Sequence, residues 1–277
     1  MEERAKEKIT NEENQYLIDY YANYDEDGRL GLRRGAFEFL TTMRYIEKYL
    51  KPGDRILEIG AATGRYSHHL ARMGYNVDAV ELLEHHIEIF RKDTNSDENV
   101  TITQGNALDL SAFQDNIYDI TLLLGPLYHL YNQEDKRQAI SEAIRVTKHG
   151  GIIFAAYVIS DSCVLFEGFI NGRFSIMDYI EKGLIDPVTF ETHSEPKDLF
   201  ELVRKEHIDD LMSVFPVSRL HYVATGGCMR YMSRMCDAIE AMDDEIYELL
   251  LKYHFATCER EDLVGISSHT IDIFKKD

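Results

Sequence analysis

The chain has 277 residues, of which 44% are hydrophobic, so it can bury a packed core and global disorder is excluded. Its 49 acidic residues outnumber its 30 basic residues, and the formal net charge is −19. Nucleic acids and anionic membranes are bound largely through lysine and arginine, so this charge argues against either of them as a partner.

The N-terminal stretch and the cysteines indicate the compartment that we expect. Residues 1–13 are of mixed charge and lack the apolar core of a signal peptide, and the longest apolar stretch, 152–159, is far shorter than a membrane span. The 4 cysteines follow no zinc-binding spacing, which is typical of free thiols in a reducing compartment. We therefore expect a cytoplasmic protein.

The first 50 residues precede the first predicted strand and are helical in character. The stretch 36–50 predicts a helix that packs on a sheet and ends at the Pro52-Gly53 pair. Four tyrosines stand further towards the N-terminus: Tyr16, Tyr20, Tyr21 and Tyr24. Tyrosine combines apolar area with a hydroxyl group, so this segment suits either plain packing or a surface that closes over a ligand.

Short apolar runs alternate with amphipathic stretches over the next hundred residues. Runs of this length that are rich in Ile, Val and Leu are typical of strands buried on both faces of a parallel sheet. We predict five such strands, at 55–61, 76–82, 100–105, 118–125 and 151–158. Helices are predicted between them at 64–73, 84–92 and 134–148. This alternation indicates an α/β fold built from βαβ units.

The regular alternation ends after residue 158. Residues 160–193 show no clean period, and a helix is predicted over Glu195–Ile208 with Ser194 as its N-cap. A strand at 219–224, a long helical region over 228–258 and a last strand at 269–274 complete the prediction.

A glycine-containing turn stands between the first predicted strand and its helix. The sequence E-I-G-A-A-T-G at 58–64 allows a tight turn, and the helix N-terminus that follows favours an anionic group. Glu81 ends the second strand, where a carboxylate accepts hydrogen bonds from both hydroxyl groups of a ribose. The glycine spacing differs from the G-x-G-x-x-G of nicotinamide and flavin sites, which disfavours an oxidoreductase.

The sequence resembles the class I S-adenosylmethionine-dependent methyltransferases. The resemblance rests on the 58–64 loop, on Glu81, on Gly105-Asn106-Ala107 after the third strand, and on the stretch 125–130 after the fourth. It implies a Rossmann-like, mostly parallel sheet of seven strands in the order 3-2-1-4-5-7-6, the seventh antiparallel, with helices on both faces. It also implies an N-terminal helical lid over residues 1–50 and a methyltransferase domain over 51–277, with helical cap segments at 160–193 and 226–262.

The same resemblance implies a cofactor, S-adenosylmethionine, with S-adenosylhomocysteine as the product. The loop would hold its amino-acid end, Glu81 its ribose, and Leu82 and Asn106 its adenine. The family often has Asp where this chain has Asn106. The cofactor-binding residues that we predict are Glu58, Gly60, Ala61, Thr63, Gly64, Glu81, Leu82, Asn106, Ala107, Leu124 and Tyr24.

The acceptor is predicted to be a small neutral or cationic molecule with an N, O or S nucleophile. His129 follows the fourth strand, at the sheet edge where ligands bind, and is the candidate general base; structural packing is an equal alternative. The predicted substrate pocket comprises Tyr128, Tyr131, Tyr20, Tyr21 and His221. We predict no metal and a monomer or homodimer. Two other functions remain open: methylation of a protein or RNA, and a sensor that binds the cofactor without catalysis.

Overall fold

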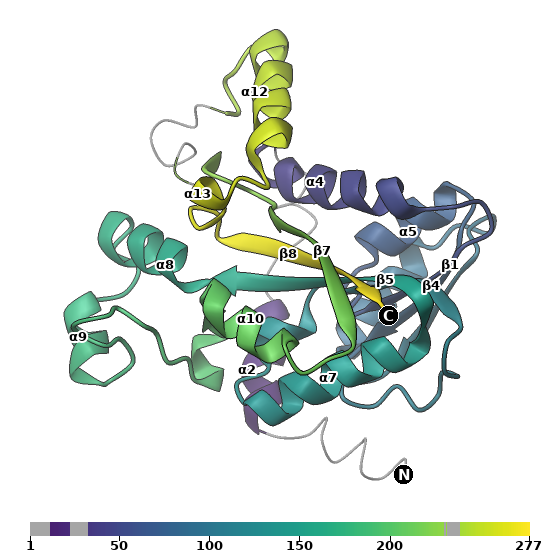
Figure 1. Cartoon of the computed structure of the whole chain (residues 1–277), viewed down its shortest axis with the longest axis horizontal. Coiled ribbons are helices and arrows are strands. Elements are labelled where there is room, and N and C mark those ends of the chain that lie inside the picture. The colour runs from purple at the N-terminus through teal and green to yellow at the C-terminus, as the bar shows by residue number, and fades with distance from the viewer. Residues whose placement is uncertain (1–11, 23–32, 230, 232–238) are drawn as a thin grey trace.

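A twisted sheet runs through the molecule and divides it into two helical layers (Figure 1). The computed structural model describes residues 12–22, 33–229, 231 and 239–277. Seven strands follow one another in the order β3-β2-β1-β4-β5-β8-β7, and the short β6 pairs with β5 outside this path. The strands are β1 (Arg55–Ile59), β2 (Asn76–Glu81), β3 (Val100–Gln104), β4 (Tyr118–Leu123), β5 (Thr147–Ile159), β6 (Leu202–Val203), β7 (Val217–Ala224) and β8 (His269–Lys276).

The pairing of the strands confirms the predicted architecture. β1 to β5 are parallel to one another, whereas β8 lies between β5 and β7 and is antiparallel to both. Because β8 runs the opposite way, its first residue lies at the edge where the parallel strands end. β6 is an eighth strand that the sequence pattern did not indicate.

Helices cover both faces of the sheet, as predicted. On one face, α4 (Arg33–Tyr49), α5 (Arg65–Arg72) and α6 (Glu84–Asp93) pack their apolar residues on the strands. On the other face, α7 (Gln133–Val146) and α10 (Lys205–Met212) cover the strands with a second apolar cluster. The apolar faces of these helices exclude water from both faces of the sheet. The central strands can therefore consist of continuous apolar sequences.

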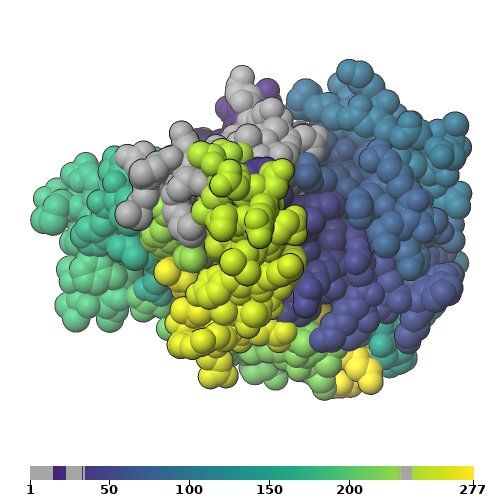
Figure 2. Space-filling model, turned by 90° about the horizontal axis from the view of Figure 1, so that it is seen from above, coloured from purple at the N-terminus to yellow at the C-terminus, as the bar shows by residue number. Residues whose placement is uncertain are grey.

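Two helical segments that follow β5 in the chain extend beyond the sheet. The first contains α8 (Ser160–Cys163), the π-helix η2 (Val164–Ile170) and α9 (Ile176–Glu181). The second contains α12 (Asp244–Thr257) and α13 (Glu261–Val264). α12 packs on α4, where the Thr41 hydroxyl and His254 Nε2 are 2.9 Å apart. In Figure 2 the teal α8–α9 segment projects from one side of the molecule, and α12 is the yellow-green ridge beside it. No helix among the described residues has the length and apolarity needed to cross a membrane.

The helix predicted over Glu195–Ile208 is wrong. The structure has a single 3-10 turn, η3 (Pro196–Asp198), after which Leu199 adopts a positive φ of 69°. That conformation ends the turn, and Leu202–Val203 then pair with β5 before α10 begins. Pairing with the sheet therefore overrides the local helical preference.

N-terminal to α4, the helix α2 (Glu12–Tyr21) lies near the edge where the parallel strands end. Its Tyr20 ring packs edge-on against Phe200, with the ring centres 6.0 Å apart. Predicted site residue Tyr24 lies outside the described residues.

Candidate functional site

The turn after β1 is shaped by its two glycines. Gly60 and Gly64 have φ angles of 76° and 94°, in the region that other residues rarely adopt. A Cβ atom on Gly60 would stand 2.7 Å from Pro126, and one on Gly64 would stand 2.4 Å from the Phe90 ring. The turn is therefore held against its neighbours so closely that side chains are excluded at both positions. It leads directly into α5, whose N-cap is Gly64.

Glu81 ties this turn to the end of β2. One carboxylate oxygen accepts a hydrogen bond from the Ala62 backbone N–H at 2.8 Å, and the other accepts one from the Leu83 N–H at 2.9 Å. The side chain is buried, and His86 Nδ1 lies 3.5 Å from it. Each carboxylate oxygen has a second lone pair, so Glu81 can hold the backbone and still accept hydrogen bonds from a ligand.

Glu58 is buried at the end of β1 and accepts a hydrogen bond from the Ser67 hydroxyl. Burial raises the pKa of Glu58 to about 8, because a charged carboxylate loses its hydration there. At neutral pH the carboxyl group is therefore mostly protonated in the ligand-free protein, and a cation placed beside it would favour its ionised form.

A cavity of about 90 Å³ opens beside the turn. Of the predicted cofactor-binding residues, five line it: Glu58, Gly60, Ala61, Thr63 and Leu124. Arg65 also lines it, with its guanidinium 4.7 Å from the centre of the Phe39 ring. Arg65 is not among the predicted site residues, although an arginine in the first turn after a glycine loop is a candidate anion-binding group. The cavity thus places an acid and a guanidinium close to the same turn.

Five further predicted cofactor residues lie at or after the ends of β1 to β3 in the chain: Gly64, Glu81, Leu82, Asn106 and Ala107. The Leu82 carbonyl accepts a hydrogen bond from the Gln104 side chain. Asn106 Oδ1 accepts one from the Leu108 N–H at 3.0 Å, and Ala107 is buried. The structure therefore brings Gly64, Glu81, Leu82, Asn106 and Ala107 to one edge, and it leaves their part in binding as a prediction.

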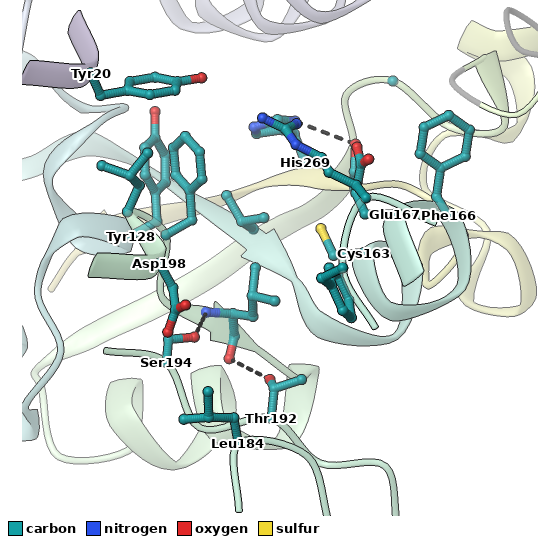
Figure 3. Close-up of a pocket in the computed structure, with 18 of the residues that line it drawn as sticks. Tyr20, Tyr128, Cys163, Phe166, Glu167, Leu184, Thr192, Ser194, Asp198 and His269 are labelled. Atoms are coloured by element: carbon teal, nitrogen blue, oxygen red, sulfur yellow. Dashed lines mark hydrogen bonds between the residues drawn. The ribbon is translucent and has the colours of Figure 1, made fainter. Parts of the chain in front are cut away.

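A second cavity, of about 590 Å³, adjoins the first one. Helix α2 contributes Tyr20 and Tyr21 to its wall, and the segment after β5 contributes much of the rest (Figure 3). Seven of its lining side chains are Phe or Tyr: Tyr20, Tyr21, Tyr128, Phe166, Phe174, Tyr179 and Phe200. Such a wall suits an apolar or flat molecule. Three of the five predicted substrate-pocket residues, Tyr20, Tyr21 and Tyr128, line this cavity.

Three side chains line both cavities: Glu38, Tyr128 and His269. Glu38 comes from α4 and His269 opens β8, with His269 Nδ1 4.0 Å from Glu38 Oε2. Neither residue is among the predicted site residues, because the two are far apart in the chain and only the fold brings them together. The one signal was that His269 begins the last predicted strand.

Both ring nitrogens of His129 have hydrogen-bond partners, and its role as a general base stays a prediction. A carbonyl oxygen only accepts, so the 2.7 Å contact with the Leu199 carbonyl shows that Nδ1 carries the proton. Nε2 then accepts a hydrogen bond from the Tyr21 hydroxyl at 3.2 Å. Burial lowers the pKa of His129 to about 4, and His129 lines neither of the two cavities described here. This arrangement favours a role in holding Tyr21 and the 199 loop over a role as general base.

The structure does not bring His221 or Tyr131 to either cavity. His221 belongs to β7, and its side chain contacts α4: Nε2 is 2.8 Å from the Tyr49 hydroxyl, and Nδ1 is 2.6 Å from Glu259. Its assignment to the substrate pocket stays a prediction, and these contacts do not support it. Tyr131 lies in the turn before α7, outside both linings. Within the described part of the chain, no three His, Cys, Asp or Glu side chains gather in a way that could hold a metal ion.

Part of the chain is similar in sequence to known methyltransferases. Residues 57–155 match the family model described as a methyltransferase domain. The chain is 34% identical over 101 residues to the demethylmenaquinone methyltransferase of Clavibacter sepedonicus, which covers 36% of this chain and 40% of that protein. It is 25% identical over 162 residues to the glycine/sarcosine N-methyltransferase of Aphanothece halophytica, which covers 57% of this chain and 58% of that protein. The chain thus spans about half the length of these relatives.

Among solved structures, the fold is similar to that of an S-adenosylmethionine-dependent methyltransferase from Methanosarcina mazei. The TM-score is 0.54 at 16% identity, and the match covers 84% of this chain and 96% of that one. At this identity the likeness establishes the shared fold.

Proposed function

We propose that this chain, a member of the class I S-adenosylmethionine-dependent methyltransferase superfamily, transfers a methyl group from S-adenosylmethionine to a small-molecule acceptor. The observation that carries the proposal is the pair of adjoining cavities with a common wall of Glu38, Tyr128 and His269. Methyl transfer needs two ligands that meet at one point, and this geometry provides two compartments that meet there.

The smaller cavity suits the amino-acid end of the cofactor. That end carries an ammonium and a carboxylate, and the cavity offers Glu58 to the first and Arg65 to the second. Glu81 would accept hydrogen bonds from the ribose hydroxyls, because its carboxylate is already fixed by the Ala62 and Leu83 N–H groups. The adenine would then extend along the ends of β2 and β3 past Leu82, Asn106 and Ala107, as the family resemblance implies.

The bound cofactor supplies an activated methyl group on a sulfonium, so the chain has to position and shield it. The acceptor atom must approach to about 3–3.5 Å in line with the methyl carbon and the sulfur. Tyr20 and Tyr21 on α2, with the segment after β5, would surround the acceptor and exclude water. His129 would serve this closure by accepting the Tyr21 hydrogen bond.

Two features support a small acceptor over a macromolecule. The larger cavity has walls from several distant parts of the chain, including α2, α4, the turn after β4, the segment after β5, the turn after β7 and the start of β8, which would enclose a compact molecule. The net charge of −19 disfavours RNA. A sensor without catalysis would need the cofactor site but not the second cavity.

Calorimetric titration with S-adenosylmethionine, S-adenosylhomocysteine and NAD tests the proposal. We expect binding of the first two and none of the third, and binding of NAD alone would refute the cofactor assignment. A radiolabelled methyl-transfer screen against pooled amines, phenols, thiols and carboxylic acids then separates an enzyme from a sensor. Binding of the cofactor with no transfer to any acceptor would favour the sensor.

A further inference from the structure

The wall between the two cavities carries a histidine and a carboxylate. Because Glu38, Tyr128 and His269 line both compartments, they surround the passage that a methyl group would cross. The exposed fractions of the His269 and Glu38 side chains are 28% and 23%, so both are partly shielded yet open to the cavities. In Figure 3, Tyr20 and Tyr128 are drawn on one side of His269, and Glu167 and Phe166 on the other.

The backbone holds His269 in a fixed place. Its carbonyl oxygen accepts hydrogen bonds from the Thr225 hydroxyl at 3.0 Å and the Ser267 hydroxyl at 2.6 Å. Its imidazole turns Nδ1 towards Ser268 Oγ, at 3.4 Å, and towards Glu38 Oε2, at 4.0 Å. A shift of about 1 Å would bring Nδ1 and Glu38 within hydrogen-bond reach, and catalytic contacts often tighten in this way when substrate binds. With its proton on Nδ1, the imidazole has its basic lone pair on Nε2.

The charged side chains of the larger cavity differ in burial according to their sign. The partly buried ones are all acidic: Glu38, Glu167 and Asp198. The basic ones, Arg173 and Lys197, are exposed. Because charges are screened less where they are shielded from water, the inner wall favours a positive group. The aromatic side chains around it add cation–π attraction.

We propose that the acceptor is a small amine with an apolar or aromatic body, and that His269, oriented by Glu38, is the general base that removes its ammonium proton. This inference rests on the proposed methyltransferase function and deepens it. The arrangement follows the general pattern in which a carboxylate fixes the tautomer and orientation of a histidine base.

The step balances in atoms and charge. His269 Nε2 takes one proton from the ammonium, which leaves a neutral amine with a lone pair. The lone pair forms a bond to the methyl carbon while the carbon–sulfur bond breaks and its electron pair stays on sulfur. The products are neutral S-adenosylhomocysteine and a methylated ammonium ion, and the proton on His269 passes to water. The acidic wall stabilises the positive charge as it moves from sulfur to nitrogen.

The acceptor class is tested with matched compounds on the intact protein. Arylalkyl amines are compared with phenols, thiols and carboxylic acids on the same carbon skeleton, with saturating S-adenosylmethionine. We expect turnover of the amines. Turnover confined to the other classes, or absent from all the amines while the cofactor binds, overturns the amine assignment. Failure of S-adenosylmethionine to bind in calorimetry refutes the proposed function itself, so the two failures are distinguishable.

The role of His269 is tested with His269→Gln. General-base catalysis contributes about 10²- to 10⁴-fold, so kcat should fall by that factor while the Kd of the cofactor changes by less than about twofold. Glu38→Gln should lower kcat by about tenfold, because it removes only the orienting charge. His149→Gln is the matched control, since His149 is exposed at the opposite end of β5. Equal kcat in His269→Gln and His149→Gln overturns the assignment.

A second readout separates a base from a residue that only fills space. An amine that is already neutral at the assay pH needs no base. For such an amine His269→Gln should lose less than about threefold in kcat, whereas for a protonated amine it should lose at least about 100-fold. Equal losses for both amines would show a structural role and overturn the proposal. If His269→Gln does not fold, the same comparison is made with Glu38→Gln, whose smaller loss should likewise disappear with the neutral amine.

Discussion

Glu58→Gln tests whether the buried carboxyl group at the end of β1 becomes charged when the cofactor binds. The pKa of Glu58 in the ligand-free protein is raised to about 8 by burial. If the cofactor ammonium binds only the ionised form, binding must release a proton at lower pH. The apparent Kd should then weaken about tenfold, or about 1.4 kcal/mol, for each pH unit below 8.

The measurement is calorimetric titration with S-adenosylhomocysteine at pH 5, 6 and 7. An α-amino group has an ordinary pKa of about 8, so the ligand stays cationic throughout this range. At pH 7, titrations in two buffers of different ionisation enthalpy should report net release of protons on binding, because Glu58 is mostly protonated in the ligand-free protein. In Glu58→Gln both the pH dependence and the proton release should disappear. A pH-independent Kd in the native protein, or an unchanged slope in the variant, would refute the reasoning.

The same carboxyl group predicts a change in folding stability. Its folded-state pKa of about 8 lies above its ordinary value of 4.5, so its favourable contribution is complete below pH 4.5 and is lost as pH rises to 8. In urea unfolding, the free energy of unfolding of the native protein minus that of Glu58→Gln should shrink by up to about 1.4 kcal/mol per pH unit as the pH rises across this window. A difference that is constant with pH contradicts the assigned burial effect.

Three further changes address the turn after β1, the proposed ribose contact of Glu81 and the proposed closure by α2. Gly64→Ala should lower the free energy of unfolding by about 2–4 kcal/mol, because its Cβ would meet Phe90 at 2.4 Å in strained backbone. The control Gly74→Ala has a similar φ of 93° but open space around it, so it should cost about 1 kcal/mol. Equal losses of stability in the two variants would contradict the steric reason. Glu81→Gln should weaken cofactor binding about 10- to 100-fold in calorimetry through lost charge-assisted hydrogen bonds, and an unchanged Kd would refute its ribose role. Tyr21→Phe keeps the ring but loses the hydroxyl contact with His129, so release of cofactor in stopped-flow measurements should be about fivefold faster.

The elements that carry strong local patterns could be predicted from the sequence. The central strands β1, β4 and β5 contain continuous apolar runs, and such runs are stable only when both faces are covered. The turn at Gly60 and Gly64 and the carboxylate at Glu81 also follow from local chemistry, since positive φ angles favour glycine and strand ends present polar groups to ligands. The order of the sheet came from the family resemblance, and the strand pairing confirms it.

Contacts between distant parts of the chain could not be predicted from local sequence patterns. The predicted helix at Glu195–Ile208 failed because pairing of Leu202–Val203 with β5 outweighs local propensity. His129 was predicted as a base from its position after β4, and no local pattern shows its contacts. In the fold its Nδ1 donates to the Leu199 carbonyl, and its Nε2 accepts from the Tyr21 hydroxyl.

The sequence by itself determined the α/β class, the glycine turn and the acidic end of β2, because each depends on residues close together in the chain. Only the tertiary structure decided which side chains line both cavities. Glu38 and His269 meet because β8 runs antiparallel beside β5, which brings its first residue to the edge where the parallel strands end. That juxtaposition is a property of the folded sheet, and no local pattern around either residue encodes it.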